Sequence, residues 1–561
     1  YVCRRDTADV RVPASLQATI AARIDRLPPA AKRTLNAAAV IGLQFDTDLL
    51  TDLVGDIDVA DLIGGELIDQ VTFTANGEYV FRHPLIRAVA YESQLKSDRS
   101  QLHRRLATAI EERDRESMDS NAALVARHLE AAGDLSAAFD WNMRAATWAQ
   151  FRDLGAARAS WKRARDVADR LPADEPHKTA MQIGPRAALC ASTFRFSGSV
   201  EDAGYDELRE LCLAARDDLS LAFAMAGRLT VLLFHNRFSH DARVATECSA
   251  LVESMGDQSL TLTISAAAAN ALVQAGEVTE GLRLAQRAIE LAGGDPMRDN
   301  IVLGSPLAVA YGLRGISRVA LGMPGWRADF DQATTIAKSV NLTSHVAGIL
   351  YKYVIAADSG ALVPDATALA ETAEALEAAE KGGDDFSLDA VRLARGMVLV
   401  NSHASHRAAG LALVNQYRDA CVRHGYATNV VRWANIENAK EKARVGDLDG
   451  AIELARPAVD FLYASGDMTS RGSAVAALVE MLLRRGGASD LAEAAAEIDR
   501  LAAVPTDPGF VLHELPLLRL RALLAQAHGD EVAYRHHRDR YRAMAIDVGF
   551  EGHMAIGAAM R

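Results

Sequence analysis

Histidines beside acids or hydroxyls are the first candidates for chemistry in this sequence. Ser239, His240 and Asp241 are the three residue types of a hydrolytic triad, but adjacent residues project in different directions and cannot form one. His403 and His406 stand three apart, a spacing that can chelate a metal, yet no cysteine or carboxylate motif accompanies them. We therefore exclude the first group as a triad and interpret the second as a solvated helix face.

Glycine-rich catalytic loops are also missing from the sequence. It contains no GxxxxGK[ST] loop to cradle a triphosphate, no GxGxxG dinucleotide fingerprint and no GxSxG nucleophile elbow. We expect no catalysis and no cofactor in this chain.

Another histidine stands where a predicted strand meets a predicted helix, in YVFRHPLIRAVAYESQL, residues 79–95. The β-formers at 79–81 lead into Arg82 and His83, and Pro84 occupies a plausible first helical position. An imidazole at a helix N-terminus suits a phosphate group, although a local cap is the alternative role for His83.

The elements around this junction have mixed character. Pro28 and Pro29 divide two helical patterns, and FDTDLLTDLVG predicts a short helix capped by Asp46 or Thr47. Two β-rich runs then flank Asn76-Gly77, a strong hairpin signal. The sequence predicts a winged helix-turn-helix domain over residues 1–113, followed by a linker over 114–121.

Residues 122–545 are helical in pattern and contain a repeated signature. A glycine turn is followed five and twelve residues later by small residues, which let the second helix approach its neighbour closely. Three copies carry the pattern: Gly133, Ala138 and Ala145; Gly276, Gly281 and Ala288; Gly446, Ala451 and Ala458. The offsets predict a mainly α chain, an α-solenoid of tetratricopeptide-like helical pairs, with a tail over 546–561.

The composition of the chain limits the classes of partner that it could bind. The net charge of −13 disfavours nucleic acid, which needs a clustered positive surface. Five scattered cysteines are typical of reduced thiols in a cytoplasmic protein, and no apolar stretch approaches the ~20 residues of a membrane span. A solenoid instead offers its concave face to a protein or peptide, or to other domains of the same protein, with a small-molecule effector as a further candidate.

The order VPASLQATIAARIDRLPPAAKRTLNAAAVIG, FRHPLIRAVAYESQL, LHRRLATAIEE and AALVARHLEAAGDLSAAFDWNMRAA resembles the region after the ATPase core of STAND-class signalling ATPases. The closing GFEGHMAIGAAM is similar to actinobacterial members. The resemblance implies that His83, and less strongly Arg82, contacts the phosphates of ATP or ADP, held with Mg by a preceding domain.

The resemblance also implies a parent protein with an effector domain. Because the chain starts at Tyr1 and ends at Arg561 directly after a helical pattern, we expect the ATPase and effector upstream, with a class III adenylate cyclase favoured. The chain would then be a sensor that relays binding on the solenoid, through the winged helix, to a nucleotide switch. A LuxR-type transcriptional regulator and a pure scaffold without a nucleotide role are the alternatives.

Overall fold

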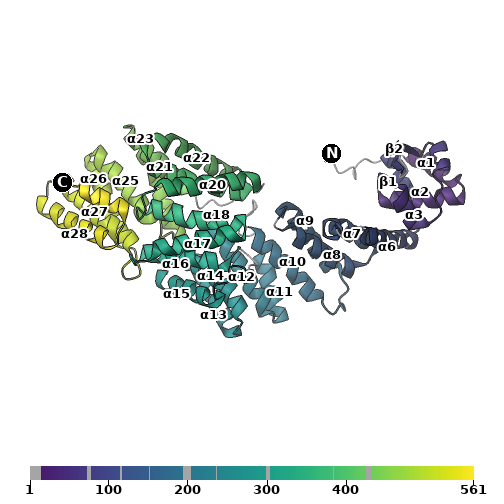
Figure 1. Ribbon diagram of the computed structural model, residues 1–561, viewed down its shortest axis with the longest axis horizontal. Coiled ribbons are helices and arrows are strands. Elements are labelled where there is room, and N and C mark those ends of the chain that lie inside the picture. Colours follow the sequence, from purple (N-terminus) through teal and green to yellow (C-terminus); the bar gives the residue numbers. More distant parts are fainter. Residues whose placement is uncertain are drawn as a thin grey trace. The chain divides into compact units, whose positions relative to one another are not determined.

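The computed structural model describes residues 14–72, 77–113, 117–150, 152–193, 204–234, 237–298, 304–382, 385–424 and 431–561. The chain forms two compact units, Tyr1–Leu189 and Cys190–Arg561. Helices dominate both units, and a small sheet lies in the first (Figure 1). None of the helices in these ranges is long and apolar enough to cross a membrane.

The first unit begins with alternating helices and strands. They are α1 (Ala14–Asp25), α2 (Pro29–Ile41), β1 (Gln44–Asp46), α3 (Thr47–Val54), α4 (Ala60–Gly64), β2 (Ile68–Thr72), β3 (Glu78–Phe81), α5 (Pro84–Glu92) and α6 (Lys96–Arg113). The proline pair separates α1 from α2, as the sequence predicts. The strands form an antiparallel sheet in the order β1-β3-β2.

Strand β1 was not expected from the sequence. Its three residues are too few to show an alternating pattern, but Phe45 lies opposite Tyr79 of β3 and is buried against Phe81 at a ring-centroid distance of 5.5 Å. Of the two predicted caps of α3, Asp46 is the one used, since its carboxylate accepts from the Leu49 amide at 2.7 Å. The predicted turn residue Asn76 lies outside the described residues.

One hydrophobic core holds this region together. Leu35 of α2, Leu50 of α3 and Leu62 of α4 are fully buried in it, together with Phe81 and with Ile86 of α5. The core therefore fixes α5, and with it His83, against the sheet and the preceding helices.

The rest of the first unit is a run of helices. It consists of α7 (Met118–Ala132), α8 (Leu135–Ala149), α9 (Leu154–Arg170) and α10 (Lys178–Ser192), whose last residues pass the boundary between the units. Each of α6, α7 and α8 packs against the next helix. Helix α7 begins at Met118, inside the predicted linker over 114–121.

The second unit is helical throughout its described residues. Its first half contains α11 (Tyr205–Ala215), α12 (Asp218–Phe234), α13 (Phe238–Met255), α14 (Gln258–Ala275), α15 (Val278–Ala292), α16 (Pro306–Ala320), α17 (Trp326–Val340), α18 (Leu342–Leu350), a π-helical turn (Tyr351–Ile355) and α19 (Ala356–Asp358). Its second half contains α20 (Ala366–Gly382), α21 (Asp385–Asn401), a 3₁₀ turn (Ala404–His406), α22 (Arg407–His424), α23 (Val431–Arg444), α24 (Leu448–Ser465), α25 (Arg471–Arg485), α26 (Ala488–Ala502), α27 (Val511–Ala527), α28 (Glu531–Asp547) and α29 (Glu551–Ala559).

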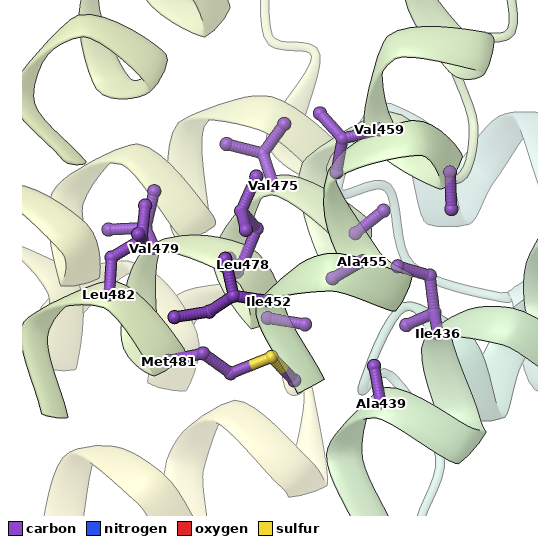
Figure 2. Close-up of a cluster of buried hydrophobic side chains, with 14 of the residues drawn as sticks. Ile436, Ala439, Ile452, Ala455, Val459, Val475, Leu478, Val479, Met481 and Leu482 are labelled. Atoms are coloured by element: carbon purple, nitrogen blue, oxygen red, sulfur yellow. The ribbon is translucent and has the colours of Figure 1, made fainter. Parts of the chain in front are cut away.

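Successive helices of this unit pack against one another, from α11 to α18 and from α20 to α29. Short connections between packed neighbours make them antiparallel pairs, which is the α-solenoid architecture that the sequence predicts. Figure 2 shows one part of the core, where Ile436, Ile452 and Val475 bring α23, α24 and α25 together.

The segment 546–561, expected to be a tail, contains α29. The α29 backbone amides of Glu551 and Gly552 donate to Ala361 and Gly360 at 3.2 and 3.0 Å, and Arg327 forms an ion pair with Glu551 at 2.7 Å. These contacts span about two hundred residues of sequence, so the last helix stabilises the solenoid.

Candidate functional site

His83 caps helix α5. Its Nδ1 accepts a hydrogen bond from the Leu85 amide at 3.1 Å, and its own carbonyl accepts from Ile86 at 2.9 Å. A neutral imidazole that accepts at Nδ1 carries its proton on Nε2. Because the side chain is exposed, this N–H is a donor available to a group outside the described chain.

The rest of the helix N-terminus has few free hydrogen-bond donors for a phosphate. Pro84 has no amide hydrogen, and the next two amides are already used by His83. Arg82, the second predicted contact, is paired with Glu66 at 3.3 Å and with Asp69 at 3.5 Å. These pairs are exposed and therefore weak, so Arg82 can leave them for a stronger anion.

Helix α5 is connected to α6 and α7 by a chain of polar side chains, in which Tyr91 is half-buried and the two histidines are buried. The Tyr91 hydroxyl lies 2.8 Å from His103 Nε2, and His103 Nδ1 lies 3.0 Å from His128 Nδ1. Burial lowers the pKa of His103 to about 4, assisted by the charges of Arg99 and Arg87. Burial, and next the neighbouring His103, lowers the pKa of His128 to about 4. Both rings are therefore neutral near pH 7 and join α5 to the first helix of the run.

The remaining histidine candidates each use Nδ1 in a local hydrogen bond. His403 Nδ1 accepts from the Ser405 amide at 3.3 Å as the cap of a 3₁₀ turn, and His406 Nδ1 lies 3.2 Å from Ser402 Oγ. No group of three or more His, Cys, Asp or Glu residues within the described ranges could hold a metal ion.

The three predicted repeat turns share their backbone form. Gly133, Gly276 and Gly446 have φ angles of +80°, +92° and +95°, the left-handed conformation that ends a helix. Asp134 and Asp447 then cap α8 and α24, accepting from backbone amides at 3.3 and 2.9 Å. The third turn has Glu277 in this place, and its side chain makes no capping hydrogen bond.

The small residues five and twelve positions after these turns all lie in helix contacts. Five of them are alanines with at most 5% exposure: Ala138, Ala145, Ala288, Ala451 and Ala458. The sixth, Gly281, is buried where α15 crosses α14. A Cβ added there would lie 2.5 Å from Val273 Cγ2 and 3.2 Å from the Ala269 carbonyl oxygen. This pair of helices therefore approaches too closely even for a methyl group.

The second unit also joins repeats that are distant in sequence. The Met468 amide donates to the Gln274 carbonyl at 2.9 Å, and the Thr279 amide donates to Asp507 at 2.7 Å. His553 Nε2 lies 3.0 Å from the Ser359 carbonyl oxygen. The long open groove expected of a solenoid is modified in this unit, because α14, the segment just before α25, and α29 take part in direct contacts between distant segments.

A cavity of about 510 Å³ lies among these segments. Its walls come from α19 and the loop after it, from α23, α25 and α27, and from α29. Apolar residues such as Leu515, Phe550 and Ile556 form part of the lining. Sequence reasoning missed this site, because its residues belong to segments up to two hundred positions apart and carry no local motif.

Five charged side chains also line the cavity: Asp358, Lys440, Glu480, Arg484 and Arg519. Lys440 pairs with Glu437 at 2.7 Å, and Arg519 pairs with Glu480. Burial raises the pKa of Asp358 to about 6, partly offset by Lys440 and by the hydrogen bond from Ser473. The cavity thus combines apolar walls with a few polar groups, the usual composition of a small-molecule site.

Comparison with known proteins yields structural likeness only. No protein-family model and no curated protein matches the sequence. A Signal Transduction ATPase with Numerous Domains (STAND) protein with a tetratricopeptide repeat sensor, from Pyrococcus horikoshii, is similar at 12% identity and a TM-score of 0.29, over 96% of this chain and 65% of that one. This chain thus spans less than two thirds of the STAND structure.

Two other solved structures are similar over 82% of the chain. The APC/C hetero-tetramer Cut9-Hcn1 has 12% identity, a TM-score of 0.43 and 85% of its chain covered. Yeast Tom70 has 11% identity, a TM-score of 0.28 and 92% of its chain covered. With all three scores below 0.5, the α-solenoid assignment rests on the helix contacts of this chain.

Proposed function

We propose that this chain is the regulatory part of a multidomain signalling protein and catalyses no reaction itself. In this proposal the solenoid binds a protein, peptide or small molecule, and residues 14–113 relay that binding to a nucleotide held by another domain of the parent protein. An adenylate cyclase is the output we favour, and a LuxR-type transcriptional output is the alternative.

The observation that carries the proposal is the geometry of His83. The ring uses Nδ1 for the helix cap and leaves the Nε2 hydrogen on an exposed surface. A donor held in this way can contact a nucleotide phosphate without losing its cap. ATP or ADP, with its Mg, would be held mainly by the other domain, and His83 would add one hydrogen bond, with Arg82 as a second contact once it leaves its carboxylates.

The order of elements supports the interpretation of residues 14–113 as a winged helix. A helix, a short strand, two helices and two further strands follow one another from α2 to β3, and β3 lies between the other two strands. The charges of α3 and α4 disfavour DNA binding, because both helices carry acidic residues and no basic ones.

The relay has a physical route in the first unit. Helix α5 is capped by His83 and meets α6 and α7 through Tyr91, His103 and His128. A change in the position of α7, the first helix of the run, would therefore shift α5 through these contacts. The competing scaffold function predicts that His83 serves only as a cap.

Replacing His83 with Ala in the parent protein distinguishes these functions. His403 is a matched control, because it is also an exposed histidine whose Nδ1 caps a short helix. Loss of a hydrogen bond to a charged phosphate should weaken ADP binding about 10- to 100-fold in His83→Ala. His403→Ala should retain wild-type affinity. Equal ADP affinity in both variants would support the scaffold function and exclude the switch.

A further inference from the structure

We propose that the groove between α27 and α28 binds an acidic peptide segment of a partner protein. Aliphatic side chains of the peptide would lie on the floor of the groove, and its carboxylates would pair with Arg521 and Arg540. The proposal names the kind of partner that the solenoid binds, so its consequence in the parent protein rests on the function proposed above. The binding itself is a property of this chain.

The groove lies where two helices of the second unit pack side by side (Figure 1). Its volume is about 340 Å³. Each helix contributes residues three and four positions apart, which share one face of a helix. The lining includes Leu517, Leu518 and Arg521 from α27, and Arg540 and Met544 from α28.

The floor of the groove is aliphatic. Leu517 and Met544 are only half-buried, so each keeps apolar surface that an occupant can remove from water. Along α27 the lining runs from Glu514 to Arg521, seven positions that span ~10 Å at the rise of an α-helix. About three residues of extended peptide have this length.

The rim carries two arginines without acidic partners. Arg521 and Arg540 take part in no ion pair and no side-chain hydrogen bond within the described parts of the chain. The other four arginines of these two helices all have partners: Arg519 pairs with Glu480, Arg535 with Glu531 and Arg538 with Asp539, and Arg542 Nε donates to the Gly557 carbonyl.

The two unpaired arginines also lie near each other. Burial, and then the charges of His536, Arg521 and Arg540, lower the pKa of His537. An arginine from each helix therefore acts on the same imidazole, and every charge that acts there is positive. This end of the groove is thus a positive patch in a chain of net charge −13.

An acidic peptide fits both the rim and the floor. A carboxylate accepts two parallel hydrogen bonds from a guanidinium, and it relieves the repulsion between neighbouring like charges. Glu514 lines the groove two helical turns from Arg521, so the carboxylates of the peptide belong at the Arg521 end. The aliphatic floor favours a peptide over a phosphate-bearing ligand, because it offers a phosphate no hydrogen-bond donor.

Three capped hexapeptides separate the charge from the apolar contact. The first alternates aspartate and leucine, the second has asparagine in place of aspartate, and the third has serine in place of leucine. Calorimetric titration of the whole chain at low ionic strength should give the first peptide an affinity at least about tenfold above that of either other peptide. No saturable binding of the first peptide at millimolar concentration, or an equal affinity for one of the others, would overturn the proposal.

Two double variants then locate the site. Arg521→Gln combined with Arg540→Gln should lower the affinity for the aspartate–leucine peptide at least about tenfold and leave that for the asparagine peptide unchanged. Arg535→Gln combined with Arg538→Gln is the matched control, because it removes the same charge from residues that are already paired, and it should bind like wild type. Equal affinity in the two double variants would refute the site. If the peptide binds as expected while His83→Ala leaves ADP affinity unchanged, the peptide site stands and the nucleotide switch fails.

Discussion

Gly281→Ala tests the close helix approach that the repeat signature predicts. A glycine inside a helix usually costs about 0.5–1 kcal/mol relative to alanine, so this substitution would normally stabilise the protein. Here the new methyl group would lie 2.5 Å from Val273 Cγ2, well inside the separation of about 3.5–4.0 Å at which carbon atoms attract.

The neighbours of Gly281 cannot move away cheaply. Val273 is fully buried and β-branched, which limits it to few rotamers, and the Ala269 oxygen belongs to the backbone of α14. Overpacking of this kind costs about 1–3 kcal/mol. After subtraction of the helix-propensity gain, we expect Gly281→Ala to destabilise the α14–α15 pair by about 1–2 kcal/mol.

Hydrogen exchange resolved by helix is the suitable assay, because a repeat protein with two units need not unfold in one step. Gly64→Ala is the control within a helix, since no atom would lie within 4 Å of its added methyl group. This variant should slow exchange in α4. If Gly281→Ala also slows exchange in α14 and α15, the close-approach reasoning is wrong.

Three further predictions concern stability. Gly276→Ala and Gly446→Ala both place alanine in a left-handed turn, but only at Gly276 would the added methyl group meet another repeat, 2.8 Å from Met468 Cγ. In hydrogen exchange resolved by helix, Gly276→Ala should therefore lose about 1 kcal/mol or more of opening free energy relative to Gly446→Ala, and equal losses would contradict the contact. His103 and His128 have pKa values below the ordinary 6.5, so the unfolded chain binds more protons; their contribution is complete above pH 6.5 and is lost as the pH falls towards 4. Between pH 7 and pH 5 the opening free energy of α6 and α7 should fall by about 2 kcal/mol or more, and a pH-independent value would exclude buried neutral rings. Burial raises the pKa of Asp358 from 3.8 to about 6, so the cost of ionising it begins above pH 3.8 and is complete above pH 6. Asp358→Asn should therefore be more stable than wild type by about 3 kcal/mol at pH 7.5 and by about half as much at pH 5, and a less stable variant at pH 7.5 would contradict the cost of burial.

Local features of the fold could be predicted from the sequence because they depend on neighbours along the chain. The break at Pro28 and Pro29, the Asp46 cap and the glycine turn at Gly446 are of this kind. Strand β1 could not be predicted, because its three residues gain strand geometry only by pairing with β3, about 35 positions later.

The candidate sites divide in the same way. The exposed junction at His83 follows from a local strand–helix pattern. The sequence offered two roles for the ring, a phosphate contact and a local cap, and the structure shows the cap. Asp358 and Arg484 have ordinary sequence surroundings. They line one cavity only because α29 packs back on residues 359–361 and α25 lies beside α23, contacts that depend on the whole second unit.

In the proposed function, the N-terminus of α5 contacts a bound nucleotide. Hydrogen exchange over residues 82–92 of the parent protein tests this contact when ADP-saturated and nucleotide-free samples are compared. We expect slower exchange in this segment with ADP, and loss of that protection in His83→Ala but not in His403→Ala. Identical exchange over residues 82–92 in the two samples, with ADP shown to be bound, would contradict it.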